Sequence, residues 1–195
     1  MSKNELLCIE SQKHKLPIAD DLLYIFVTQF NDEAVSKFYD QFLKMSANSD
    51  TKIIPVVISS FGGQVHSLLP MLDIIKASNK PVATIALGKA MSCGAILLAA
   101  GTKGYRYAAP NADVMLHEVT SMSWDKSTNL QNDAKHVKRI NDLLFQLVGD
   151  WSGKGRNYFL KQLKKKSNVD WYLTANESKR LGLVDHVGVP SLLKK

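Results

Sequence analysis

A serine stands between two apolar segments of the chain, in a pattern that can present a nucleophile. Ser92 lies in the sequence Met-Ser-Cys-Gly-Ala, after the apolar run 82–87 and before the apolar stretch 95–100. Where a strand turns sharply into a helix, the side chain at the turn projects outward, and the first N–H groups of the helix have no partners within it. The pattern therefore predicts a nucleophile and an oxyanion site in one place.

Two further segments carry groups that acyl transfer requires. A serine hydroxyl needs a base to take its proton, a group that orients the base, and N–H donors for the oxyanion. The Gly62-Gly63 turn lets a backbone N–H approach a substrate, because glycine brings no side chain. Of the five histidines, His117 ends an apolar strand, where a base at a sheet edge is expected, although its spacing equally fits a structural histidine. These features together are typical of a serine peptidase.

The residue pattern alone does not select the acid that orients the base. The competing carboxylates are Asp113, Glu118, Asp125, Asp170 and Asp185. Glu118 adjoins His117, but neighbouring side chains of a strand point to opposite faces, which weakens its claim. Taken without further context, Asp170 is interpreted as an aspartate that flanks a helix or a turn.

Apolar periodicity along the chain alternates between strand and helix, which predicts an α/β fold. Pro55 is expected near the start of its strand or at a sheet edge, and Pro70 is expected to bend its helix or to lie in the first turns. The expected strands are 23–27, 53–58, 82–87, 105–107, 114–117 and 183–187. The expected helices run from Asn31 or Asp32 to about Lys44, then over about 65–75, 92–100 and 130–151, with a last one that begins at the capping box Thr174/Glu177 and ends at Gly182.

Length and composition narrow the classes of protein to which the chain can belong. A chain of 195 residues, 45% hydrophobic and 22% charged, fits one globular domain in water. No stretch approaches the roughly 18 consecutive apolar residues of a membrane span, and the few apolar residues before Glu10 disfavour a secretory signal. The two cysteines, Cys8 and Cys93, show no metal-type spacing, so a cytoplasmic location is expected, with no metal and no cofactor.

The formal net charge of +7 raises the question of nucleic-acid binding. The basic residues gather late in the chain, at Lys135, Lys138, Arg139, Lys154, Arg156 and 161–166. Acidic residues lie among them at Asp133, Asp142 and Asp150, which favours a solvated helical face over a nucleic-acid partner.

Ordered motifs extend this interpretation to a family. They are SFGGQV at 60–65, GKAMSCGA at 88–95, MLHE at 115–118, and VDWYLTANE at 169–177 followed by GLVD at 182–185. Over about residues 23–188 the chain resembles the Clp protease proteolytic subunit, a family of self-compartmentalising serine peptidases. The resemblance implies a ClpP/crotonase-like α/β fold, a superhelix of repeated β-β-α units with a protruding helical handle. It implies a single domain at 23–190, after an N-terminal segment 1–22 and before a basic tail 191–195.

The resemblance also assigns roles to residues. It implies Ser92 as nucleophile, His117 as general base and Asp170 as orienting acid. Backbone N–H groups of Gly63 and Cys93 match the positions that form the oxyanion hole. The implied activity is ATP-independent endopeptidase cleavage of peptides or unfolded proteins inside a chamber of identical subunits, with a heptameric ring as the expected assembly. An AAA+ unfoldase partner and the stacking of two rings stay open, and neither a membrane nor a nucleic acid is expected as a partner.

Departures from the family's motifs lie in the glycine turn and in segments that concern assembly. Phe61 replaces a proline, residues 120–125 replace a glycine-rich strip, and Val169 replaces an arginine that pairs across the ring interface. Exposed apolar residues such as Trp124 and Phe145 are expected to add to a partner surface. Two alternative functions remain: a catalytically impaired ring subunit or divergent paralogue that assembles with an active protease, and a crotonase-type acyl-CoA enzyme.

Overall fold

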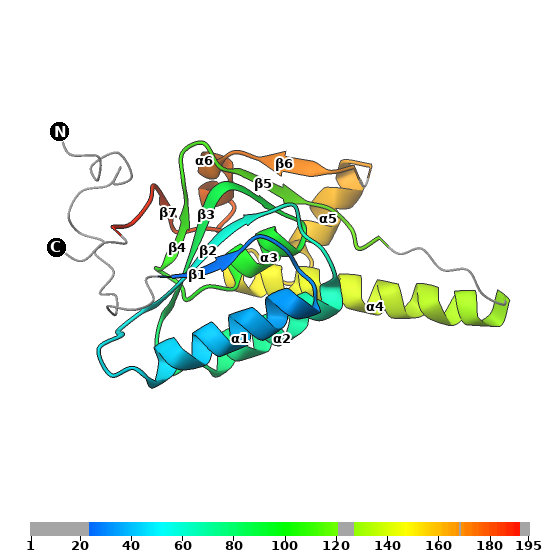
Figure 1. Cartoon of the computed structure of the whole chain (residues 1–195). Helices are drawn as coiled ribbons and strands as arrows, with labels where there is room; N and C mark the ends of the chain where they lie inside the picture. The colour runs from blue at the N-terminus through cyan, green and yellow to red at the C-terminus, as the bar shows by residue number, and fades with distance from the viewer. Residues whose placement is uncertain (1–23, 121–126, 168, 192–195) are drawn as a thin grey trace.

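The computed structural model describes residues 24–120, 127–167 and 169–191, which form an α/β structure (Figure 1). Five strands lie side by side in parallel, in the order β1 (Ile25–Val27), β2 (Ile54–Ser60), β3 (Val82–Met91), β4 (Arg106–Ala108) and β7 (His186–Val187). The first half of β3 pairs with β4, and its last residues pair in parallel with β5 (Asp113–Leu116). On its other side β5 pairs with the antiparallel strand β6 (Trp171–Leu173). The predicted α/β class is confirmed.

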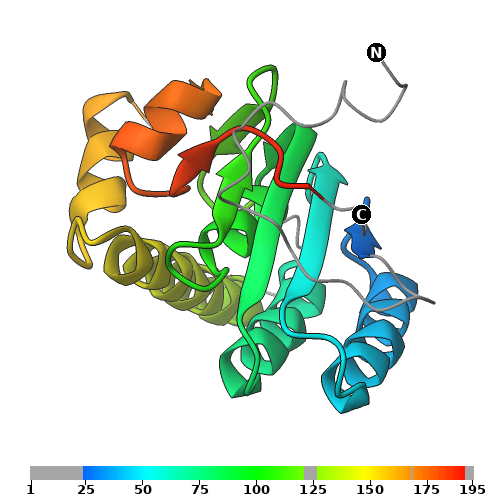
Figure 2. The ribbon, with the colours of Figure 1, turned by 90° about the vertical axis from the view of Figure 1, so that its left-hand side faces the viewer.

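Helices pack along the sheet and extend beyond it. They are α1 (Asp32–Ala47), α2 (Val65–Ala77), α3 (Cys93–Ala99), α4 (Ser127–Ser152), α5 (Tyr158–Lys165) and α6 (Ala175–Arg180). Helices α1, α2 and α4 lie on the same side of the sheet (Figure 2). One end of α4 projects well past the sheet, as expected for a helical handle (Figure 1). Among the helices of the described ranges, none is both long enough and apolar enough to cross a membrane.

The core lies between the sheet and these helices. Strands β2 and β3 both contribute to it, and Ile54 and Ile58 of β2 are fully buried there, whereas Ile85 of β3 is fully buried in a second, smaller cluster. Burying an aliphatic side chain of this size contributes about 1.5–3 kcal/mol. Phe145 is 1% exposed and packs in this core, so its predicted place on a partner surface is wrong. Trp124, the other residue expected there, lies outside the described residues.

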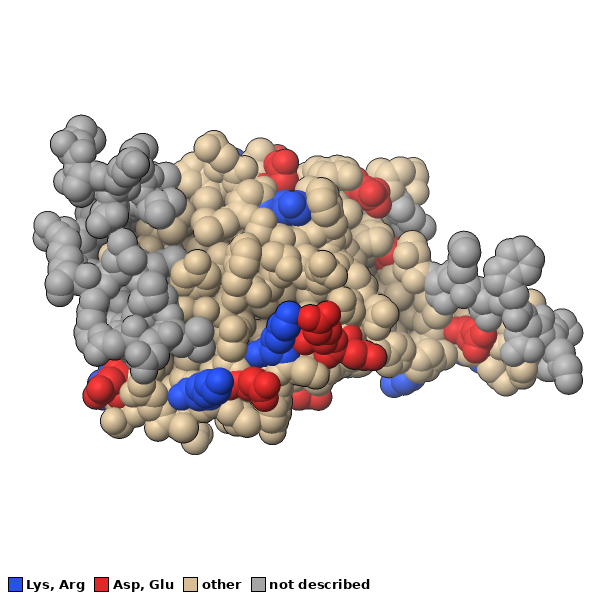
Figure 3. All heavy atoms as spheres, in the orientation of Figure 1, with Lys and Arg blue, Asp and Glu red and all other residues tan. Residues whose placement is uncertain are grey.

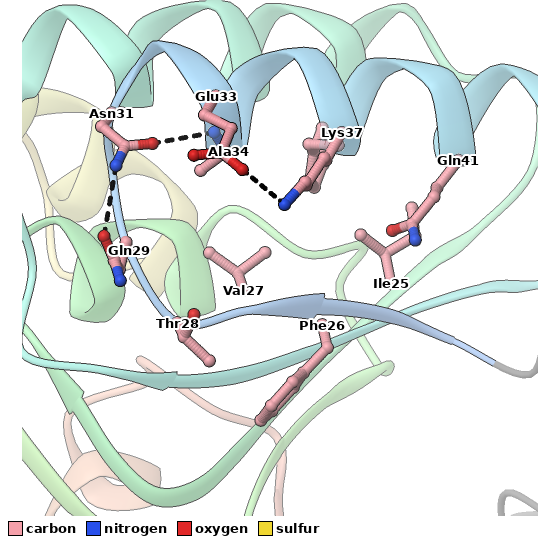
Figure 4. Close-up of a pocket in the computed structure, with 11 residues that line it drawn as sticks. Ile25, Phe26, Val27, Thr28, Gln29, Asn31, Glu33, Ala34, Lys37 and Gln41 are labelled. Atoms are coloured by element: carbon pink, nitrogen blue, oxygen red, sulfur yellow. Dashed lines mark hydrogen bonds and ion pairs between the residues drawn. The ribbon is translucent and has the colours of Figure 1, made fainter.

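Local signals in the sequence position the first residues of α1 and α6. Asn31 caps α1, as its Oδ1 accepts a 2.8 Å hydrogen bond from Ala34 N–H, and its Nδ2 donates to Gln29 in a cleft between β1 and α1 (Figure 4). Thr174 and Glu177 form the predicted capping box of α6. Pro70 lies inside α2, and Pro55 is the second residue of β2, which is an interior strand.

Strand β3 differs from expectation, whereas the basic segment lies on an exposed helical face, as expected. The expected strand ended at Leu87, but β3 continues to Met91, with Gly88 at φ +73° and a register shift between Ile58 and Ser60 on the neighbouring β2. The basic segment 161–166 lies mostly in α5, whose lysines are exposed while Phe159 and Leu163 are buried.

A buried ion pair holds β4 against the segment before β7. Arg106 Nη2 lies 2.6 Å from Asp185 Oδ1, and Nε donates to Oδ2 at 2.9 Å. The Arg106 side chain is only 3% exposed, whereas the pair Lys37–Glu33 on α1 has both side chains more than two-thirds exposed. On the face shown in Figure 3, acidic and basic side chains lie beside each other along α1.

Candidate active site

Ser92 occupies a sharp turn between β3 and α3. Its backbone has φ +55° and ψ −121°, a conformation that costs a non-glycine residue on the order of 1–3 kcal/mol. Hydrogen bonds compensate for this strain: Ser92 N–H donates to Met115 O at 2.9 Å, and Ser92 O accepts from Ala95 and Ile96 N–H. The backbone is therefore fixed between β5 and the first turn of α3, and the hydroxyl projects from the turn.

The base predicted from the sequence lies beside this hydroxyl. Strands β3 and β5 pair in the register Met91 to Met115, so the end of β5 lies next to the turn. His117 follows the last residue of β5 and is half-buried. Its Nε2 lies 2.8 Å from Ser92 Oγ, within the distance at which a general base takes a proton.

The register between β5 and β6 places Asp170 next to His117. The antiparallel pairing ends with Leu116 opposite Trp171, so the next position of the register puts Asp170 opposite His117. Residues directly opposite each other in antiparallel strands have Cβ atoms about 4.5–5.5 Å apart on the same face. Asp170 is exposed, and no hydrogen bond joins its carboxylate to His117 in this structure. The register thus places Asp170 near His117, but the two side chains are not hydrogen-bonded to each other.

The glycine turn packs directly against Ser92. Gly62 has φ +109°, and a Cβ added to it would lie 2.7 Å from Ser92 Cβ and 3.1 Å from Ser92 Oγ. Gly63 has φ +151°, and an added Cβ there would lie 2.6 Å from Phe30 O. Both positions therefore require glycine, on steric and on conformational grounds.

Two backbone N–H groups lie in the segments beside Ser92, one in α3 and one in the glycine turn. Cys93 is the first residue of α3, so its N–H has no acceptor within the helix. No described residue accepts a hydrogen bond from Gly63 N–H. The two segments are linked, because Cys93 Sγ–H donates to Gly63 O over 3.3 Å. Nucleophile, base and paired N–H donors are together the parts that acyl transfer uses.

The other carboxylates that the sequence offered have different surroundings. Asp185 is bound to Arg106, as described above. Asp113 is exposed at the start of β5, and Glu118 is half-buried beside His117. Asp125 lies outside the described residues. Among these candidates Asp170 alone follows from the β5–β6 register, extended by one residue, as the position opposite His117.

The remaining described histidines stack on other rings. His66 and His136 stack on each other at 5.9 Å between ring centroids, and His186 stacks on Tyr107 at 4.9 Å. His14 lies outside the described residues.

One residue near the base was not singled out by the sequence. Asn141 of α4 is 8% exposed, and its Oδ1 accepts a 3.0 Å hydrogen bond from Val119 N–H, two residues after His117. The sequence did carry a signal for it: Asn141 is a polar residue on the apolar side of α4, between the buried residues Ile140 and Leu144.

Comparison with known families agrees with this geometry. The sequence model of the family described as Clp protease matches residues 11–191, nearly the whole chain. The chain belongs to the Clp protease family. Its members are peptidases, so this protein is a peptidase of the Clp protease type. Members generally assemble into oligomeric rings.

Proposed function

We propose that this Clp protease family member is a serine endopeptidase with Ser92 as nucleophile, His117 as general base and Asp170 as orienting acid. One observation carries the proposal: His117 Nε2 lies 2.8 Å from the hydroxyl of a serine held at φ +55°. A serine strained into that turn, with a base at hydrogen-bond distance, has the geometry of an activated nucleophile.

The reaction follows from these positions. Ser92 Oγ attacks the carbonyl carbon of the scissile peptide bond while its proton passes to His117 Nε2. The carbonyl oxygen becomes an oxyanion that accepts hydrogen bonds from Gly63 and Cys93 N–H. His117 then gives the proton to the leaving amine as the C–N bond breaks, which leaves an acyl-enzyme. A water molecule, deprotonated by the same imidazole, hydrolyses the ester and regenerates Ser92.

Asp170 completes this set after a small movement. Its position opposite His117 lets a side-chain rotation bring the carboxylate to the imidazole Nδ1–H, since the Cβ atoms of such a pair are about 5 Å apart. The carboxylate then fixes the tautomer in which Nε2 is free to accept the serine proton. The side chain of an exposed aspartate rotates at little energetic cost. The missing hydrogen bond between Asp170 and His117 is therefore compatible with catalysis.

The substrates we propose are peptides and unfolded proteins, cleaved inside a chamber of identical subunits in the cytoplasm. Hydrolysis by these three residues consumes only water, so peptide cleavage itself is ATP-independent. Any unfoldase partner would act in delivering protein substrates to the chamber. We propose a heptameric ring as the assembly. The alternative is a catalytically impaired ring subunit, which the missing hydrogen bond between Asp170 and His117 favours. The contact between Ser92 and His117 argues against an acyl-CoA enzyme of the crotonase type.

Peptide hydrolysis by matched serine variants tests the proposal. Ser92→Ala and His117→Ala are each expected to lower kcat by at least about 10³-fold, because the members of such a set act as a unit. Ser59→Ala removes a hydroxyl from the neighbouring strand β2 and is expected to retain wild-type activity. Hydrolysis by folded Ser92→Ala at the wild-type rate would contradict the proposal.

A further inference from the structure

The thiol of Cys93 joins the two segments that supply the proposed oxyanion donors. Its Sγ lies 3.3 Å from Gly63 O, and the residue is 1% exposed. Cys93 and Gly63 are far apart in sequence, one at the start of α3 and the other in the turn after β2. The hydrogen bond is therefore a tertiary link between the nucleophile turn and the glycine turn.

This link completes a clamp on one peptide unit. The peptide that joins Gly63 to Gln64 has its carbonyl bound by the Cys93 thiol. Its N–H donates to Phe30 O at 2.8 Å. Both ends of the unit are thus held, one by α3 and one by the segment before α1. Gly63 is otherwise free to rotate, because glycine has the widest range of backbone angles.

We propose that Cys93 is a positioning residue, whose thiol fixes the Gly63 N–H relative to the Cys93 N–H so that both donors meet the oxyanion. This inference rests on the proposed function. The Gly63 N–H lies on the preceding peptide unit, which meets the clamped unit at Gly63 Cα. Loss of the thiol bond would leave the clamped unit held at one end only, so that Gly63 Cα and its N–H could shift away from the reacting carbonyl. Oxyanion stabilisation depends on donors that are in place before the charge develops.

The protonation state of the thiol suits this role. Burial raises the pKa of Cys93 above its ordinary value. The group is therefore a neutral S–H at neutral pH and can donate to a carbonyl, which a thiolate cannot do. A thiolate at this place would also repel the developing oxyanion.

Substitutions that differ only in the donor test the inference. Cys93→Ala removes the donor, and Cys93→Ser restores one of similar size. The probe is a peptide boronic acid: its boron accepts a lone pair of Ser92 Oγ while the serine proton passes to His117, which gives a tetrahedral adduct with an oxygen in the hole. All rates are divided by the concentration of active sites, which is titrated with a fluorophosphonate. Unfolded protein therefore does not lower the measured rate per site.

We expect Cys93→Ala to lower kcat by about three- to tenfold with KM nearly unchanged, and to weaken boronate binding by the same factor. Cys93→Ser is expected to stay within about twofold of wild type in both measurements. The inference is overturned if Cys93→Ala equals wild type per active site, or if Cys93→Ser loses as much as Cys93→Ala. A purely packing role would lower the active fraction and leave the boronate affinity of the remaining sites unchanged.

A second measurement needs no substitution at Cys93. In Cys8→Ser protein, Cys93 is the one remaining thiol of the sequence. Its infrared S–H stretch is expected at lower frequency than that of a thiol in an apolar solvent, and an unshifted band would overturn the inference. If wild type binds boronate no better than Ser92→Ala does, the proposed function fails with the inference. If wild type binds boronate, Ser92→Ala does not, and the Cys93 variants match wild type, the inference alone fails.

Discussion

Replacement of Gly62 by alanine tests whether the glycine turn holds the nucleophile in place. The added methyl group would lie 2.7 Å from Ser92 Cβ, whereas carbon atoms in contact are about 3.5–4.0 Å apart. The turn or Ser92 must therefore move by about 1 Å. A displacement of that size at reacting atoms costs about 10²-fold in rate. We expect Gly62→Ala to lower kcat/KM for a fluorogenic peptide by about that factor.

Gly104→Ala is the matched control. Gly104 also has positive φ, at +90°, but a Cβ there meets nothing within 4 Å. The two variants share the backbone strain of alanine at positive φ, and only Gly62→Ala adds the contact with Ser92. Each protein is compared with wild type in kcat/KM and in thermal unfolding. If Gly62→Ala retained wild-type kcat/KM, or if Gly104→Ala lost as much activity, the packing of this turn would not control Ser92.

Three further predictions concern the acid, the buried ion pair and assembly. Asp170→Asn should leave the melting temperature unchanged and lower kcat by about 10⁴-fold, because an amide does not enforce the imidazole tautomer; near-normal turnover would point to a Ser-His dyad. Asp185→Asn should lower the free energy of unfolding in urea by about 3–5 kcal/mol, because it leaves the buried charge of Arg106 without a counter-charge. As a control, Glu33→Gln in the exposed pair on α1 should cost less than about 1 kcal/mol. Burial alone would raise the pKa of Asp185, but hydrogen bonds and the charge of Arg106 lower it overall, so the wild-type protein should lose this stabilisation as the pH falls below about 4, and Asp185→Asn should not show that loss. Mass photometry should show a closed ring of identical subunits, and a fully active monomer would contradict the proposed chamber.

The local elements followed from the sequence because their signals are short-range. Asn31 as a cap, the Thr174/Glu177 box and the apolar period of α4 each depend on residues within a few positions. Ser92 was placed at a strand-to-helix turn for the same reason, since the turn lies between an apolar run and small residues. These are features that the chain encodes in sequence neighbours.

The remaining features depend on contacts between distant segments. Residue pattern alone did not select Asp170, because its place opposite His117 depends on the pairing of β5 with β6. The thiol link from Cys93 to Gly63 is likewise a tertiary contact. Phe145 was expected on the surface, but α4 turns it into the core, where it is 1% exposed. A period of apolar residues shows which residues share a face and does not show what covers that face.

The most direct test of the account is the site of covalent modification by a fluorophosphonate. The probe should attach to Ser92 Oγ with loss of fluoride, and peptide mapping by mass spectrometry should find the adduct on the peptide that contains residues 91–95. Labelling should be absent from Ser92→Ala and should fall strongly in His117→Ala, because the base lies 2.8 Å from the hydroxyl. An adduct on another residue, or equal labelling of folded Ser92→Ala, would contradict the assignment of Ser92 as the nucleophile.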